Sequence, residues 1–112
     1  MLTKALNITW SICPIFKFNF SIKIMKEFEK KIAAIIPTLN EEKGIAKVIE
    51  SMPNPVVSDI IVVDSCSTDR TREVAEEKGA IVVEEPRRGY GRAYKTGFKN
   101  LPKDTDIVVC LD

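Results

Sequence analysis

The chain has 112 residues, the length of a single domain, and its 17 basic and 16 acidic side chains leave a formal net charge of +1. A charge this close to zero provides no field that would collect nucleic acid without specific contacts, so we expect no nucleic-acid partner. Hydrophobic residues make up 45% of the chain and charged residues 29%, which is typical of a soluble globular domain with a packed core.

The chain has no histidine and only three cysteines, Cys13, Cys66 and Cys110. Without histidine, the chain itself contains neither a Ser-His-Asp nor a Cys-His catalytic group, and no imidazole ligand for a metal. The odd number and wide spacing of the cysteines indicate neither a disulfide framework nor a zinc site, and fit a reducing, cytoplasmic location. Any catalysis must therefore use carboxylates, hydroxyls, backbone dipoles, Lys or Arg, or a hard cation held by oxygen.

Residues 1–30 differ from the rest and are expected to be an N-terminal extension of uncertain order. Leu6 to Ile15 is apolar, but Pro14 interrupts it and lysines follow, which argues against a membrane-spanning helix. Apolar and polar residues alternate from Phe16 to Ile24, as in an edge strand with one apolar face. An equally good interpretation is that Met25 is the natural start and that the preceding residues have no role in the fold.

From residue 31 onward, short apolar strands alternate with amphipathic helices. Ile32 to Ile36 is the first predicted strand, closed by Pro37. A helix follows, because apolar side chains recur at helical spacing at Ile45, Val48, Ile49 and Met52. Ile60 to Val63 is then a strand buried on both faces, and a helix runs from about Asp69 to Lys78, ended by Gly79.

Strands and helices continue to alternate in the second half of the chain. Ala80 to Val83 is a third strand, and a polar connection covers Glu84 to Gly91. The apolar face of a third helix is marked by Tyr94, Gly97, Phe98 and Leu101. Asp106 to Leu111 is a fourth strand. The prediction for residues 31–112 is therefore an α/β domain, an open parallel sheet of about four strands with helices on both faces.

The loops that follow the strands are expected to meet at one edge of the sheet, where ligands bind in such folds. Asp64 is the first residue after the buried strand, so we expect its carboxylate to point into the crevice, with Ser65 beside it. One of Ser67, Thr68 and Asp69 is expected to cap the following helix. Carboxylates and hydroxyls at this edge suit the hydroxyls of a ribose and the imide N–H of a base.

Three arginines, Arg87, Arg88 and Arg92, flank Gly89-Tyr90-Gly91 at a helix start. They suit a diphosphate, although a solvated basic loop explains any one of them equally well. The glycines do not form a dinucleotide-binding fingerprint, and the chain has no P-loop. Asp112 at the end of a strand suits a divalent cation between two phosphates, but one carboxylate is too few to establish a metal site.

Four motifs, in this order and spacing, resemble the donor half of a family 2 glycosyltransferase of the GT-A fold, and they are Ala34 to Glu42, Ile61 to Asp69, Arg88 to Ala93 and Val108 to Asp112. Within that family they are most similar to the polyprenol (dolichyl) phosphate sugar synthases and the glucosyl-3-phosphoglycerate synthase type.

The resemblance implies a role for each matching position. It implies that Pro37, Leu39 and Glu41 line the nucleotide pocket, that Asp64 and Ser65 lie at the base, and that the loop at Gly89 and Tyr90 closes over it. Asp112 matches the first acid of the Asp-x-Asp motif, which binds the donor diphosphate through Mg²⁺ or Mn²⁺.

The implied reaction is transfer of a sugar from a UDP- or GDP-sugar to an acceptor such as polyprenyl phosphate or a small phosphorylated acid. The second acid, the acceptor half and the catalytic base of complete members lie beyond the position of Asp112, so we expect a truncated chain that binds the donor with little activity alone. With a polyprenol acceptor, the cytoplasmic enzyme would be peripheral at the membrane face.

Two other interpretations stay open. One is a non-catalytic nucleotide-binding module, or half of a split enzyme, that pairs with a partner chain. The edge of the sheet beyond the fourth strand would favour such pairing, or self-association. The other is a receiver-like phosphoacceptor domain, which would need a pair of acids where Pro37 and Thr38 stand.

Overall fold

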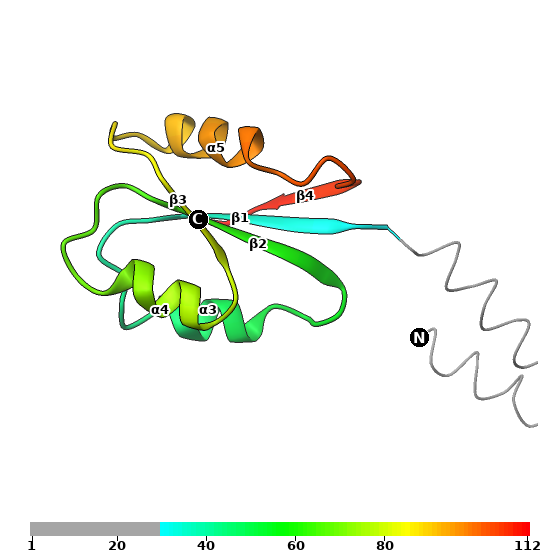
Figure 1. Cartoon of the computed structure of the whole chain (residues 1–112), viewed down its shortest axis with the longest axis horizontal. Helices are drawn as coiled ribbons and strands as arrows, with labels where there is room; N and C mark the ends of the chain where they lie inside the picture. Colours follow the sequence, from blue (N-terminus) through cyan, green and yellow to red (C-terminus); the bar gives the residue numbers. More distant parts are fainter. Residues whose placement is uncertain (1–29) are drawn as a thin grey trace, which may run out of the picture. The chain divides into compact units, whose positions relative to one another are not determined.

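The structure is a computed structural model that describes residues 30–112 (Figure 1). The predictions for the N-terminal extension, including the alternating segment Phe16 to Ile24 and the start at Met25, lie outside the described residues. None of the helices in the described part is long and apolar enough to cross a membrane.

Strands and helices alternate along residues 31–112, as predicted. The elements are β1 (Ile32–Thr38), α3 (Ile45–Ser51), β2 (Val57–Asp64), α4 (Thr71–Glu77), β3 (Ile81–Glu84), α5 (Tyr90–Lys99) and β4 (Ile107–Cys110). The four strands are parallel and lie in the order β3-β2-β1-β4. Helices α3 and α4 cover one face of the sheet and α5 covers the other (Figure 1). The predicted fold class is confirmed.

Two strands are longer than the sequence indicated. β1 continues through Pro37 to Thr38. The Leu111 N–H donates to the Ile35 carbonyl at 3.0 Å, so the backbone of β1 at residue 35 faces β4. The backbone of Pro37, two residues later, faces the same way, just past the last residue of β4. The next acceptor in this ladder would be the Leu111 carbonyl, and it accepts from the Tyr94 hydroxyl at 2.8 Å instead, so the missing N–H of the proline leaves no acceptor unpaired. β2 begins at Val57, because its polar first half still pairs with β1.

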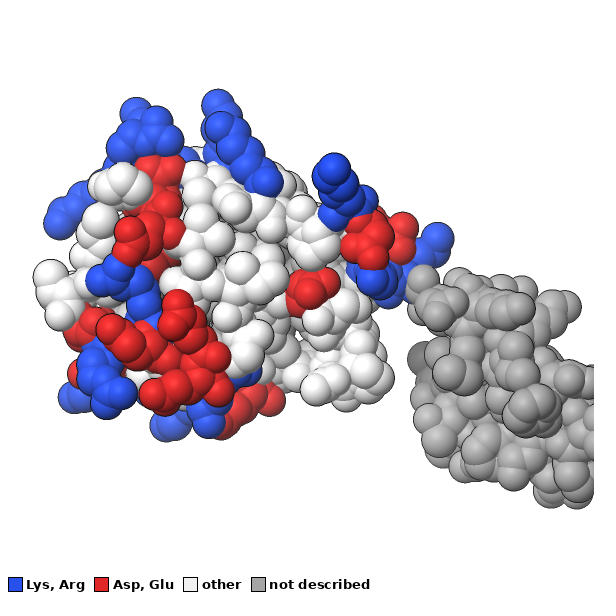
Figure 2. Space-filling model, in the orientation of Figure 1, with Lys and Arg blue, Asp and Glu red and all other residues white. Residues whose placement is uncertain are grey.

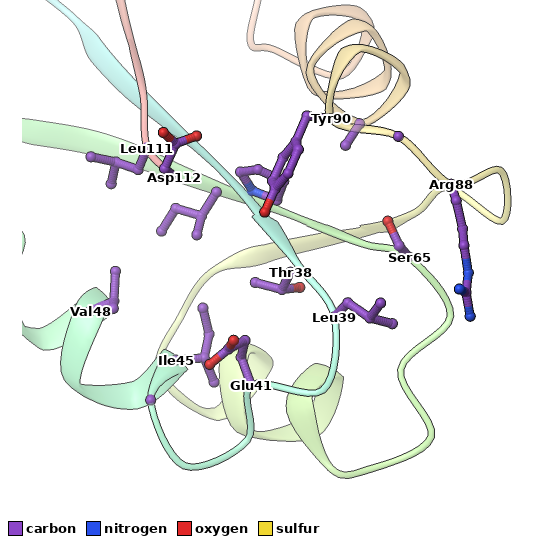
Figure 3. A pocket seen from close by; sticks show the side chains of 15 residues that line it. Thr38, Leu39, Glu41, Ile45, Val48, Ser65, Arg88, Tyr90, Leu111 and Asp112 are labelled. Atoms are coloured by element: carbon purple, nitrogen blue, oxygen red, sulfur yellow. The ribbon is translucent and has the colours of Figure 1, made fainter.

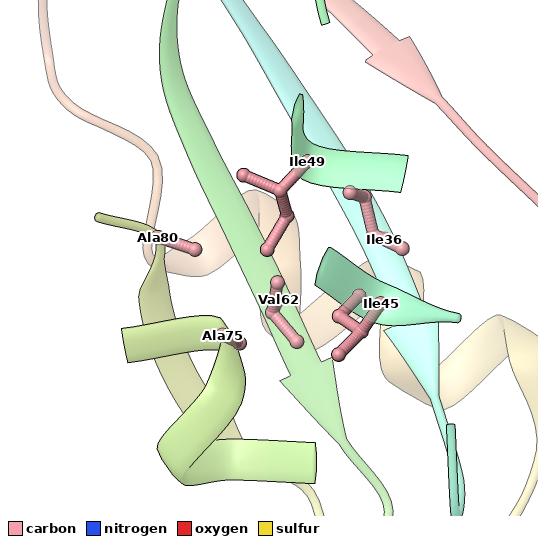
Figure 4. Packing of buried hydrophobic residues seen from close by; sticks show 6 residues of the cluster. All are labelled: Ile36, Ile45, Ile49, Val62, Ala75 and Ala80. Atoms are coloured by element: carbon pink, nitrogen blue, oxygen red, sulfur yellow. The ribbon is translucent and has the colours of Figure 1, made fainter. Parts of the chain in front are cut away.

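Each face of the sheet has its own apolar cluster. Figure 4 shows the cluster beneath α3 and α4, formed by Ile36, Ile45, Ile49, Val62, Ala75 and Ala80. The opposite cluster joins Ile35, Ile61 and Val63 to Ala93 of α5. The alternation of β1 and β2 side chains between these clusters explains why both strands are continuous apolar runs.

Helix α5 approaches the sheet through small residues. Ala93 and Gly97 are buried one turn apart, and a Cβ built on Gly97 would lie 2.6 Å from Cγ2 of Ile35. Tyr94 and Leu101 pack against the same cluster. Phe98 is 50% exposed, so its assignment to the apolar face was wrong. The small residues let α5 lie close to the sheet, with Ala93 and Gly97 on the side of the helix that faces it. Phe98 lies outside this buried side.

Residues 40–42 and 67–71 form a set of hydrogen bonds that we call the loop clasp. Asn40 N–H donates to the Ser67 hydroxyl at 2.8 Å, and the Asn40 amide oxygen accepts from Thr68 N–H at 2.8 Å. Glu41 N–H donates to the Thr71 hydroxyl at 2.8 Å. Glu42 N–H donates to the Asp69 carboxylate at 3.2 Å, while the Glu42 carboxylate accepts from Arg70 N–H at 3.0 Å. The clasp fixes two strand-to-helix loops against each other.

The start of α4 differs from the prediction because of this clasp. The residue at its N-cap is Arg70, which makes no side-chain capping bond. Asp69, one residue earlier, accepts from Thr71 N–H at 3.0 Å, whereas Ser67 and Thr68 bind Asn40. Gly79 has φ +88 directly beyond the helix, so the predicted ending is confirmed.

β4 forms one edge of the sheet, and Ile107 and Val109 on it are 45% and 40% exposed. The exposed apolar edge is as expected. Association through it stays a prediction.

Replacement of Gly97 by alanine should destabilise the fold. The added methyl group would overlap buried Ile35, and overpacking costs about 1–3 kcal/mol, against about 1 kcal/mol returned by the better helix propensity of alanine. We expect a net loss of up to about 2 kcal/mol in the free energy of unfolding, measured by urea denaturation of the whole chain. Gly91→Ala in the same helix is the control, since its Cβ meets nothing within 4 Å. Equal stability of the two variants would contradict this packing.

Replacement of Asn40 tests the loop clasp. Its backbone has φ 52, a conformation that asparagine tolerates better than alanine, and its side chain accepts from Thr68. Asn40→Ala should lose about 2–3 kcal/mol, about 1 for the hydrogen bond and the rest for the left-handed backbone. Asn40→Gly keeps the backbone and should lose about 1–2 kcal/mol. Chemical denaturation of both variants measures these losses. A glycine variant that is less stable than the alanine variant would contradict the contribution assigned to the left-handed backbone at Asn40.

Candidate functional site

A pocket with a volume of about 520 Å³ lies at the carboxyl edge of the sheet, between the loops after β1, β2 and β3 and the end of β4. This volume is within the range of small-ligand sites. All of the predicted site residues except Asp64 line it, namely Pro37, Leu39, Glu41, Ser65, Gly89, Tyr90 and Asp112. The fold thus gathers side chains separated by up to 75 positions, from 37 to 112, around one cavity.

The walls of the pocket combine apolar and polar surface (Figure 3). Ile45 and Val48 of α3 line one side, and Leu111 and Asp112 lie near the end of β4. Tyr90 stands at the start of α5 and is 68% exposed. A large aromatic ring that is not needed for packing, set at the rim of a cavity, is available to stack on a planar ligand.

Asp64 does not point into the pocket, so this expectation is corrected. Its side chain is fully buried at the end of β2. The carboxylate accepts from Ser67 N–H at 2.9 Å and also from the Ser67 hydroxyl, and Arg72 Nε lies 3.7 Å away. The chain turns back at Cys66, where φ is 60, and this turn brings Ser67 onto the carboxylate. Asp64 therefore stabilises the loop after β2 from its buried side and does not face the pocket.

Ser65 takes the place at the pocket that was expected of Asp64. Its N–H donates to the Thr38 carbonyl at 2.9 Å, which extends the pairing of β1 and β2 by one step. Its side chain lies at the pocket between Thr38 and Arg88 (Figure 3). Strand alternation explains the exchange, because consecutive residues point to opposite faces of the sheet.

The three arginines of the glycine-containing loop have different environments. Arg88 lines the pocket, while Arg92 is exposed and does not line it. Arg87 is bound to Glu85. Gly89 has φ +126, a conformation that other residues rarely adopt, and the α5 helix starts at the next residue. The N-terminus of α5, with Arg88 beside it, thus lies at the pocket, where such ends favour anions.

Glu85 is buried behind this loop and was not singled out from the sequence. Its carboxylate accepts from Arg87 Nε at 2.9 Å, Arg87 Nη2 at 3.0 Å and Arg87 N–H at 3.0 Å, and from the Thr96 hydroxyl at 2.5 Å. The Arg87 side chain, followed by the Thr96 hydroxyl, lowers the pKa of Glu85 to about 2. Glu85 is therefore ionised at neutral pH. Its polar character, within a polar loop, gave no signal of burial.

Glu41 and Asp112 are the two carboxylates that line the pocket. Tyr94 donates to the Leu111 carbonyl at 2.8 Å and lies 3.2 Å from an oxygen of Asp112. Burial, followed by the hydrogen bond to Asp112, raises the pKa of Tyr94, so the phenol remains a proton donor. The sequence placed Tyr94 only on the apolar face of α5. Within residues 30–112, no three His, Cys, Asp or Glu side chains gather as a metal site.

In Figure 2 the charged side chains gather mainly along the left side and the top of the described unit, while the middle of this face is largely uncharged. Basic and acidic groups lie next to each other where they gather on this face. Several such groups of the described residues form ion pairs, such as Lys78 with Glu50 at 2.5 Å. No broad area of one sign appears on this face, in agreement with the small net charge.

Comparison with known proteins gives consistent matches. Residues 33–112 match Glycosyl transferase family 2. The low-salt glycan biosynthesis hexosyltransferase Agl6 of Haloferax volcanii is 44% identical over 78 residues, which cover 65% of this chain and 19% of that protein. Protein RfbJ of Shigella flexneri is 42% identical over 82 residues, covering 72% of this chain and 62% of that protein.

Solved structures of glucosyl-3-phosphoglycerate synthase from Mycobacterium tuberculosis share the fold. The complex with Mn²⁺, UDP and glucosyl-3-phosphoglycerate superimposes with a TM-score of 0.64 at 35% identity, covering 74% of this chain and 33% of that one. The complex with Mg²⁺ and UDP gives a TM-score of 0.64 at 34% identity, covering 79% of this chain and 36% of that one. The sheet and helices match the GT-A glycosyltransferase fold over this part.

The chain spans between about a fifth and three fifths of the lengths of these relatives. The family match nevertheless includes the pocket residues and every strand and helix described above, except Ile32 at the start of β1. The chain belongs to glycosyl transferase family 2.

Proposed function

We propose that this chain binds the nucleoside diphosphate part of a sugar-nucleotide donor for a glycosyltransferase reaction. The observation that carries the proposal is the meeting of Leu39, Glu41, Ser65, Tyr90 and Asp112 around one cavity of about 520 Å³. In a parallel α/β sheet, the carboxyl edge of the strands is the usual place for such a ligand.

The base and ribose fit the part of the pocket formed by the first two loops. Leu39 and the exposed ring of Tyr90 offer apolar surface to a flat base. The carboxylate of Glu41 and the hydroxyl of Ser65 suit an imide N–H and ribose hydroxyls, because both groups accept hydrogen bonds in a partly dry site. These features favour a uracil or guanine nucleotide without deciding between them.

The diphosphate fits the part of the pocket between Arg88, the start of α5 and Asp112. Arg88 and the helix N-terminus favour phosphate oxygens. Asp112 offers hard oxygen ligands, and Mg²⁺ or Mn²⁺ takes few carboxylates besides phosphate oxygens and water. The residues therefore fit a divalent cation that is shared with the donor, which is consistent with the Mn²⁺ and Mg²⁺ in the solved relatives. Such a cation would neutralise the charge of the leaving diphosphate.

Transfer of the sugar also requires an acceptor and a base that removes its proton. One solved relative contains UDP-glucose and phosphoglyceric acid together with Mn²⁺, and the matched region covers 33% of it. A small phosphorylated acid and a polyprenyl phosphate are both acceptors within this proposal, and the acceptor site would be formed outside the matched region. A cytoplasmic location, at the membrane face for a polyprenol acceptor, is part of the same proposal.

The proposal predicts saturable, cation-dependent binding of UDP or GDP by the 112-residue chain, measured by calorimetry with Mn²⁺ and after its removal by a chelator. Tyr90→Ala should weaken binding about 5- to 100-fold, the range expected for loss of stacking on a base. Asp112→Asn should reduce the affinity measured with Mn²⁺ to the value measured without it. Glu76→Gln, on the exposed side of α4, is the control and should bind like the wild type.

A folded wild-type chain that binds neither nucleotide would refute the proposed function. Binding that is unchanged by both Tyr90→Ala and Asp112→Asn would place the nucleotide elsewhere on the molecule. Nucleotide binding without any effect of Mn²⁺ would support a non-catalytic nucleotide-binding module over a donor site that works with a cation.

A further inference from the structure

The segment Arg88 to Tyr90 forms one wall of the pocket, and its Gly89 carbonyl accepts from the N–H groups of Arg92 and Ala93 at 3.1 Å in the first turn of α5. All three residues are exposed, and Gly89 at φ +126 adds no side chain that could pack. A glycine here gives the backbone more freedom than any other residue would. The conformation that places Arg88 and Tyr90 at the pocket must therefore be held by residues outside it.

Glu85 connects this segment to two fixed elements. Its N–H donates to the Asp64 carbonyl at 2.9 Å, which continues the pairing of β3 with β2. Its carboxylate accepts hydrogen bonds from Nε and Nη2 of the Arg87 guanidinium, and from the Arg87 N–H as well. The second oxygen also accepts the hydroxyl of Thr96, on α5. One residue thus joins the end of β2, through its backbone, to the loop and the following helix, through its side chain.

The Glu85 carboxylate is a buried charge, and both of its oxygens accept hydrogen bonds. The side chain of Glu85 is 4% exposed, whereas that of Arg87 is 65% exposed. A buried carboxylate is tolerated only when it is paired and hydrogen-bonded, so these contacts cannot be given up without cost. Because Arg87 directly precedes Arg88, the bonds that hold its backbone and side chain also limit the positions open to the pocket wall.

We propose that Glu85 is a positioning residue, which acts through Arg87 and Thr96 to hold the segment Arg88 to Tyr90 in the conformation that lines the donor pocket. The proposal rests on the proposed function for the ligand, although the contacts themselves do not. A loop that is ordered before the ligand arrives loses less entropy on binding, so the effect is on nucleotide affinity.

Thr96 gives the sharpest test, because it contacts Glu85 and does not line the pocket. Thr96→Val removes the hydroxyl and keeps the shape, while Thr96→Ser keeps the hydroxyl. Glu85→Gln is the companion variant, which removes the charge that Arg87 binds. Urea denaturation of each whole chain measures global stability, so that loosening of the loop can be separated from unfolding.

Limited trypsin digestion of the native chain measures the loop directly. Arg87 and Arg88 are cleavage sites within it, and Lys99 at the end of α5 is an internal reference site. We expect cleavage at Arg87 or Arg88 to become about tenfold faster in Thr96→Val and Glu85→Gln, the change expected from loss of one hydrogen bond to a charged group. Thr96→Ser should match the wild type, and the rate at Lys99 should not change.

Calorimetry with UDP or GDP and Mn²⁺ then links the loop to the pocket. Affinity should fall severalfold in Thr96→Val and return in Thr96→Ser. Unchanged loop cleavage in both Thr96→Val and Glu85→Gln would overturn the proposal, and so would faster cleavage with unchanged affinity. If the wild-type chain binds no nucleotide, the proposed function fails, and the digestion result alone decides whether Glu85 holds the loop.

Discussion

The buried carboxylate of Asp64 is the constraint on which the site depends. It closes onto the N–H and hydroxyl of Ser67, and this short turn directs Ser67, Asp69 and Thr71 toward the loop after β1. There the loop clasp joins residues 40–42 to residues 67–71. A charged group is costly to bury unless it is fully bonded, so the turn has little freedom to change. Both loops thereby become rigid walls for the pocket.

The opposite wall depends on close packing. Gly97 and Ala93 let α5 lie directly on Ile35 and its neighbours, and this position brings the start of the helix to the pocket. Glu85 then fixes the loop that leads into α5 through Arg87 and Thr96. The pocket is therefore assembled from two sides by different means, polar bonds between loops on one side and a small-residue helix contact on the other.

The residues of the pocket divide into exposed ones that line it and buried ones that support it. The exposed residues at the pocket, Leu39, Glu41, Arg88 and Tyr90, are not needed to build the core and are available to a ligand. The buried polar residues Asp64 and Glu85 lie behind them and support the loops. A donor site that must bind a highly charged diphosphate benefits from such support, because ordering the loops in advance lowers the entropy cost of binding.

The sequence by itself determined the strands, the helices and the parallel direction of the strands, because apolar periodicity and chain connectivity specify these locally. Because the loops after parallel strands must share one edge, it also indicated that Ser65, Arg88 and Asp112 lie at a common site, and the family resemblance added Pro37, Leu39, Glu41, Gly89 and Tyr90. Only the tertiary structure decided that Asp64 is buried while Ser65 faces the pocket, that Phe98 is left outside the core, and that Asn40 binds Ser67 and Thr68. These outcomes depend on which groups from distant segments meet, and a local pattern carries no information about partners that are 25 or more positions away, as Asn40 is from Ser67.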